Sequence, residues 1–149
     1  YACQYGHLNI VQLLLANGAD PNIIDSCDIS PLGIAIDSGY REIVLELLNY
    51  PNIVIELPCD VDLNIMIKAC ELGWTDVVSR LLDLGASIEV SEFCDEIPLH
   101  MASQEGHVNL VQMLLERGAN INKFNYYGRT PLMNACNNRN NNRNNNFDQ

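Results

Sequence analysis

The chain has few basic residues and lacks the motifs that mark many functional classes. It carries 8 Lys plus Arg against 19 Asp plus Glu, for a formal net charge of -11. Such a surface repels phosphate backbones, so we expect no nucleic-acid partner. No run of about 18 apolar residues is present, and we therefore expect no membrane span. G-x-S-x-G, P-loop, H-E-x-x-H and glycine-rich dinucleotide motifs are also missing. We accordingly predict no catalysis, cofactor, metal or small-molecule substrate.

A period of about 33 residues runs through the sequence. Its clearest marker is a glycine that recurs at steps of 33, 34 and 33 residues. These glycines are Gly6, Gly39, Gly73 and Gly106. An alanine stands four residues before each, and Ala135 continues that series. A fixed period of this length indicates a stacked repeat protein, because each unit buries its apolar face only against its neighbours.

Within each period the pattern predicts two short antiparallel helices. After each glycine, a Val is followed by a Leu-Leu pair at i+3 and i+4, which places three apolar side chains on one helix face. A Gly-Ala step closes three of the four units, because glycine accepts the left-handed conformation of a helix C-cap. In the second repeat Pro51 stands in that place and is expected to end the helix, since it cannot continue one.

The first helix of a unit begins at a Pro-Leu pair. Proline suits the first helical position because its φ is preset and it has no unpaired N–H. Ser30 and Thr130 precede two of these prolines and supply N-cap oxygens. The third repeat reads Asn64-Ile65-Met66-Ile67 without a proline, so its helix start is the least defined.

These features strongly resemble the ankyrin repeat family, whose pattern is T-P-L-H-x-A, then G-H, then V-x-x-L-L and G-A-x-x-N. Residues 97–102, Gly106-His107 and residues 111–122 match it almost throughout. The resemblance implies an all-α solenoid of stacked helix-turn-helix units with protruding β-turn fingers. The expected domain is 1–136, with a partial repeat 1–22, repeats at about 23–55, 56–89 and 90–122, and a partial repeat 123–136. Because the chain opens inside a repeat, we expect it to be a piece of a longer protein.

The sequence departs from the family pattern at the turns and at its end. The turn glycine survives only as Gly128, and Asp28, Asp62 and Asp95 replace it. Aspartate tolerates the left-handed conformation better than most residues. Residues 137–146 contain eight Asn and two Arg, so 137–149 is predicted to be a disordered, Asn-rich tail. This tail resembles the asparagine tracts of AT-rich protists and large DNA viruses.

The histidines and cysteines are expected to be structural. His7 and His107 occupy the G-H slot, and the resemblance implies that His100 bonds to neighbouring backbone. Six cysteines form no C-x-x-C pair. Three of them follow an alanine at places two repeats apart, beyond disulfide reach. They are Cys3, Cys70 and Cys136. We predict small buried side chains in a reducing, intracellular compartment.

The resemblance implies that the chain is a scaffold that binds another protein through turn tips and the exposed side of the first helices. Carried over by position, the tip candidates are Phe93, Glu96, Phe124, Tyr126, Tyr127 and Arg129. The helix candidates are Glu71, Leu72, Gln104 and Glu105. Exposed aromatic residues beside an arginine are typical of interface hot spots. Alternatively, the phenylalanines and one tyrosine pack between adjacent tips, or a further repeat covers them.

Three other functions stay open at the level of the sequence. The first is an adaptor segment that selects targets for a larger protein, as in viral and bacterial ankyrin proteins that recruit host ubiquitin machinery. No recruiting motif is visible here, so this function depends on sequence outside the chain. An enzyme would need a polar cluster in one groove. The last alternative is a spacer without a dedicated partner.

Overall fold

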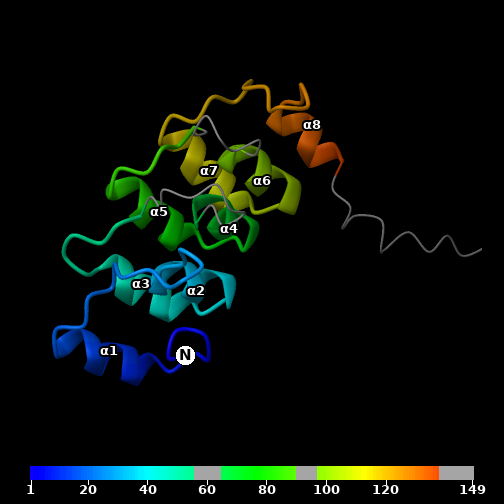
Figure 1. Cartoon of the computed structure of the whole chain (residues 1–149). Coiled ribbons are helices and arrows are strands. Elements are labelled where there is room, and N and C mark those ends of the chain that lie inside the picture. The colour runs from blue at the N-terminus through cyan, green and yellow to red at the C-terminus, as the bar shows by residue number, and fades with distance from the viewer. Residues whose placement is uncertain (56–64, 90–96, 138–149) are drawn as a thin grey trace, which may run out of the picture. The chain divides into compact units, whose positions relative to one another are not determined.

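The computed structural model describes residues 1–55, 65–89 and 97–137, and these residues form eight α-helices and no strand (Figure 1). The prediction of an all-α chain is therefore confirmed. Two compact units divide the structure. The first comprises Tyr1–Ala69 and Asp76–Ala86, and the second Cys70–Thr75 and Ser87–Gln149. All eight helices fall inside the expected repeats, whose limits stay predictions.

The first unit is built around one helix pair. Helix α2 (Pro31–Asp37) packs against α3 (Arg41–Leu48), and α1 (Leu8–Ala16) also contacts α3. The unit further contains the start of α4 (Ile65–Glu71) and nearly all of α5 (Thr75–Asp83). One face of α3 is completely buried, as the i, i+3, i+4 pattern predicts. Its members are Ile43, Val44, Leu47 and Leu48.

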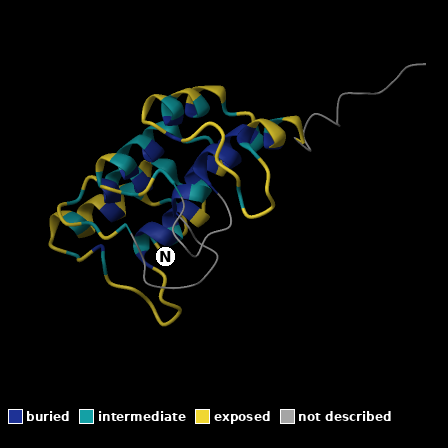
Figure 2. Cartoon of the chain, turned by 90° about the horizontal axis from the view of Figure 1, so that it is seen from above, coloured by how far each residue is buried: buried dark blue, intermediate teal, exposed yellow. Residues whose placement is uncertain are grey.

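The second unit is centred on α6 (Pro98–Glu105), which contacts both α7 (Val108–Glu116) and α8 (Pro131–Cys136). Leu99, Ala102, Leu110 and Leu114 form its apolar core. Figure 2 shows that the buried positions lie mainly along the helices, whereas the turns that join them are mainly exposed. The turns are thus available for contacts, whereas the helices provide the support.

Helix starts follow the sequence rules where a hydroxyl is present. The Ser30 hydroxyl accepts a hydrogen bond from Gly33 N, and the Thr130 hydroxyl accepts one from Met133 N. Each is followed by proline at the first helical position, as predicted. Helix α6 has the proline but Ile97 as its N-cap, and no side chain caps it.

Replacing Ile97 tests the value of that missing cap. Threonine and valine have nearly the same shape, so Ile97→Thr and Ile97→Val lose similar packing at this buried position. Only threonine offers an oxygen to the first turn of α6. We expect Ile97→Thr to exceed Ile97→Val in free energy of unfolding by about 1 kcal/mol, measured by urea denaturation. Equal stabilities would show that the first turn of α6 gains nothing from a side-chain cap.

Helix ends use the left-handed conformation, as the Gly-Ala steps predict. Gly18, Gly85 and Gly118 have φ of 85°, 97° and 93°. In the second repeat α3 already ends at Leu48, before Pro51, and the left-handed residue is Asn52 with φ of 62°. Because proline cannot adopt a positive φ, the chain makes the same reversal one residue later.

In two of the described repeats, the residue that follows the mid-repeat glycine packs on the glycine of the preceding repeat. These residues are Tyr40 and His107. A Cβ on Gly73 would lie 2.7 Å from Cε1 of His107, and one on Gly6 would lie 2.3 Å from Cε1 of Tyr40. His107 Nε2 also donates to the carbonyl of Glu71 at 2.8 Å. The structural role predicted for His107 is therefore confirmed. His7 occupies the same slot but is exposed.

The cysteine prediction is correct for one residue and wrong for another. Cys70 is fully buried, Cys3 is half-buried and Cys136 is exposed. Cys136 ends α8 in the last partial repeat, and no described helix follows to cover it. All three are free thiols, as is the exposed Cys27. Cys59 and Cys94 lie outside the described residues.

Candidate functional site

The last tip comprises residues 124–129, and residues 125–129 of it form a closed turn held by one asparagine. Asn125 Oδ1 accepts from Tyr127 N at 3.0 Å and from Arg129 N at 2.9 Å. Asn125 N donates to the Arg129 carbonyl, and Gly128 N donates to the Asn125 carbonyl. Gly128 takes a φ of 69°, which glycine adopts without strain. The side chains of this tip therefore project from a defined backbone.

An equivalent turn in the first unit confirms that an aspartate can replace the turn glycine. Asp25 Oδ1 accepts from Cys27 N and Ile29 N at 2.8 and 3.0 Å, just as Asn125 does in the second unit. Asp28 occupies the glycine position and adopts a φ of 59°. The prediction for Asp62 and Asp95 falls outside the described residues. The two turns share a backbone but differ in their side chains, because the first carries no aromatic residue.

The last tip exposes three aromatic side chains. Tyr126 is 76% exposed, Tyr127 71% and Phe124 63%. The two tyrosine rings meet edge to face, with centroids 5.5 Å apart and planes at 85°. Described residues thus leave all three rings open to contact, so none of them packs into an adjacent described tip. Arg129 is exposed beside them.

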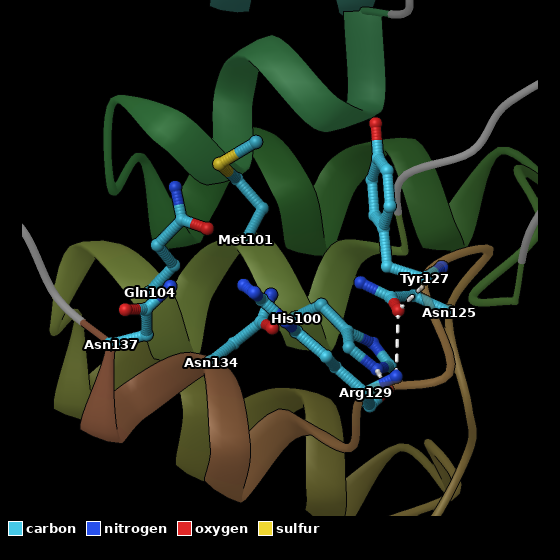
Figure 3. Close-up of a pocket in the computed structure, with 8 residues that line it drawn as sticks. All are labelled: His100, Met101, Gln104, Asn125, Tyr127, Arg129, Asn134 and Asn137. Carbon is cyan, nitrogen blue, oxygen red and sulfur yellow. Dashed lines mark hydrogen bonds between the residues drawn. The ribbon is translucent and has the colours of Figure 1, made fainter.

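A pocket of about 400 Å³ lies beside this tip, between it and helices α6 and α8 (Figure 3). Its lining residues are His100, Met101, Gln104, Asn125, Tyr127, Arg129, Asn134 and Asn137. His100 is buried and its Nε2 donates to the Arg129 carbonyl at 2.9 Å. The prediction that His100 bonds to neighbouring backbone is therefore confirmed. This bond fixes the tip to helix α6.

The structure brings some of the predicted site residues together and leaves others elsewhere. Tyr127, Arg129 and Gln104 line the same pocket. Glu105 follows Gln104, whose amide donates to its carboxylate at 3.3 Å. Glu71 and Leu72 are exposed at the end of α4 and do not line the pocket. Phe93 and Glu96 lie outside the described residues, so their predicted role is neither supported nor contradicted.

Sequence reasoning missed part of the pocket. Asn134 and Asn137 were not singled out, although each stands one 33-residue period after another lining residue. Asn134 is equivalent to Met101, and Asn137 is equivalent to Gln104. Comparing successive repeats at the same register would have found them, because equivalent helix positions face the same side of a stack.

The charge around the site differs from that of the chain. Residues 117–137 contain two Arg and one Lys and no acidic residue, whereas the whole chain has a net charge of -11. These basic residues are Arg117, Lys123 and Arg129. The segment that carries the last tip is therefore aromatic and basic in sequence, on an acidic protein.

Neither a group of metal ligands nor a membrane-spanning helix occurs in the described ranges. Among residues 1–55, 65–89 and 97–137, no three His, Cys, Asp or Glu side chains form a group that could hold a metal ion. No described helix has the length and apolar character needed to cross a bilayer.

Comparison with known proteins places the chain in a family. The model of ankyrin repeats (3 copies) matches residues 1–92, 50–125 and 91–144. The chain is 32% identical over 117 residues to a putative ankyrin repeat protein of fowlpox virus, FPV223, covering 78% of the chain and 81% of that protein. It is 32% identical over 141 residues to human palmitoyltransferase ZDHHC13, covering 94% of the chain.

A third relative is human ankyrin repeat and SOCS box protein 11, which is 35% identical over 105 residues and covers 69% of the chain. The chain spans 23% of the palmitoyltransferase and 31% of the SOCS box protein. The likeness to these two is therefore a likeness to one segment of each. Since the family model matches most of the residues and the repeat geometry agrees with it, the chain belongs to the ankyrin repeat family.

Proposed function

We propose that this ankyrin repeat chain binds a partner protein through the last described tip and the helix ends beside it. Ankyrin repeats are protein-interaction modules and typically not catalytic. The observation that supports this particular surface is the exposed edge-to-face pair of Tyr126 and Tyr127 on a turn fixed by Asn125. Rigid exposed aromatic residues offer contact area at little entropic cost.

The proposed partner surface combines apolar and acidic groups. Aromatic rings favour an apolar counterpart, and the exposed Arg129 favours a carboxylate. Phe124 and Arg129 lie on the same tip, and Gln104 and Glu105 border it on α6. We propose that the interface also includes the other predicted contact residues, Glu71, Leu72, Phe93 and Glu96. Nucleic acid and membrane are not proposed partners, because the chain as a whole is acidic.

Replacing the tyrosine pair tests this surface. We expect Tyr126→Ala/Tyr127→Ala to weaken binding of the partner at least about thirtyfold, because hot-spot residues contribute about 2 kcal/mol or more each. The full chain is immobilised, partners are captured from a lysate of the source cell and identified by mass spectrometry, and their affinity is then measured by titration. Circular dichroism checks that the variant is folded.

The chain contains a matched control for this variant. Tyr1 and Tyr5 are also exposed and stacked on each other, with centroids 6.3 Å apart, but lie in the first unit. Tyr1→Ala/Tyr5→Ala should leave the affinity unchanged. Equal losses from both double variants, or a partner retained by both, would place the interface elsewhere.

We also propose an adaptor role as the second candidate, in which this segment selects a target for a larger protein such as the host ubiquitin machinery. Its support is that one relative combines ankyrin repeats with a SOCS box in one protein, of which this chain matches 31%. We further propose an intracellular location, because the four described cysteines are all free thiols. Capture of ubiquitin-ligase components together with the partner would favour the adaptor, and capture of the partner without them would favour the simple binder.

A further inference from the structure

Two buried side chains that line the pocket beside the last tip, here called its floor, carry hydrogen-bond acceptors without partners. His100 is 2% exposed and Asn134 is 6% exposed, and both line the pocket (Figure 3). Because the Arg129 carbonyl can only accept, His100 Nε2 must carry the proton of that bond. In the imidazole tautomer with its proton on Nε2, Nδ1 is an acceptor. Nδ1 of His100 and Oδ1 of Asn134 both lack a hydrogen-bond partner.

Unpaired buried acceptors favour a ligand that supplies N–H groups. Leaving such an atom unsatisfied is unfavourable, and a donor that enters the pocket would remove that cost. The remaining lining includes groups that donate, among them the amides of Gln104 and Asn137 and the Arg129 guanidinium. A matching ligand therefore needs donors for the floor and an acceptor for these groups.

We propose that the pocket receives the primary carboxamide of an asparagine or glutamine side chain from the partner protein. Its NH₂ group donates to His100 Nδ1 and Asn134 Oδ1, and its carbonyl accepts from the donors around them. A carboxylate brings no donor to the two acceptors, and the exposed charge of Arg129 opposes a lysine or arginine. This inference rests on the proposed function, since it names the side chain that the partner inserts.

Short blocked peptides test the selectivity without the partner. The probes are N-acetyl-Gly-Xaa-Gly-N-methylamides with Xaa of Gln, Asn, Glu, Lys or Leu, because the methylamide end carries no primary carboxamide. They are titrated into the ¹⁵N-labelled full chain and followed by NMR. We expect the Gln or Asn peptide to shift the resonances of His100 and Asn134 saturably, and to bind at least about tenfold more tightly than the others.

A variant of Asn134 provides the second test of this proposal. Asn134→Leu removes the acceptor at similar volume, and should leave the fold intact because the buried Oδ1 atom that it removes has no hydrogen-bond partner. It is expected to abolish the preference for Gln or Asn. Leu132→Ala lies on the same helix, is 73% exposed and does not line the pocket, so it should keep that preference.

The two proposals fail in different experiments. Equal binding of all five peptides, tighter binding of the Glu or Lys peptide, or a preference that survives Asn134→Leu would overturn the carboxamide pocket. Loss of partner binding from Tyr126→Ala/Tyr127→Ala would still uphold the aromatic tip in that case. Retention of the partner by that double variant would reject the tip as the interface, whatever the peptides show.

Discussion

Replacing Gly73 by alanine is expected to lower the free energy of unfolding by about 3 kcal/mol. Gly73 has a φ of 69°, and an added Cβ would lie 2.7 Å from Cε1 and Nδ1 of His107. An alanine in the left-handed region costs about 1–2 kcal/mol by itself. The imidazole cannot withdraw without losing the hydrogen bond that its Nε2 donates to Glu71, which adds about 1 kcal/mol or more.

Gly39 offers the matched control. It occupies the same place in the preceding repeat with a φ of 79°, but a Cβ there meets nothing within 4 Å. Gly39→Ala should therefore lose only the backbone contribution of about 1–2 kcal/mol. Urea denaturation of both variants measures the difference. In the background of His107→Ala, the added loss at Gly73 should disappear, and equal losses at the two glycines in the native background would rule out the clash.

Cys70 is expected to react with iodoacetamide at least about a thousandfold more slowly than Cys27 in the folded chain at about pH 8. Burial raises the pKa of the Cys70 thiol from 9.0 to about 12, so very little of the reactive thiolate forms. Cys27 is exposed. Peptide mass spectrometry after timed labelling measures both rates in one sample. In denaturant the two rates should converge, and similar rates in the folded chain would contradict the burial of Cys70.

The same thiol predicts how stability changes in alkali. The folded-state pKa lies above the unfolded one, so the contribution of Cys70 is complete below about pH 9 and is lost as pH rises toward about 12. Each pH unit in that window costs up to about 1.4 kcal/mol. The free energy of unfolding of Cys70→Ala should fall less steeply with rising pH than that of the native chain, as measured by urea denaturation at each pH. Parallel slopes would show that Cys70 does not control this pH range.

The glycines and prolines explain why so much of the fold could be predicted. Gly18, Gly85 and Gly118 end helices, and Pro31, Pro98 and Pro131 begin them, because both residue types act on the local backbone. Asp28 was expected to replace a turn glycine for the same local reason, and it does. The shift of the left-handed residue from the position of Pro51 to Asn52 depends on how the chain continues after α3, which the period alone does not specify.

The sequence predicts the position of the aromatic residues on a turn, but not whether their rings are exposed. The repeat register placed Phe124, Tyr126, Tyr127 and Arg129 on a turn, but whether rings lie exposed or pack on a neighbour depends on contacts between elements. The exposure of Cys136 has the same origin, because the equivalent residues Cys3 and Cys70 are half-buried and buried although all three stand at the same place in the repeat.

The sequence by itself determined the period, the all-α class, the family and the places where helices begin and end, because each depends on residues within one repeat. Only the tertiary structure decided which of these residues meet. His100 in α6 and Asn134 in α8 lie 34 residues apart, and their common pocket exists because α6 and α8 pack together and the Arg129 carbonyl holds the histidine ring. Burial and unpaired acceptors are properties of that packing, and no single repeat contains them.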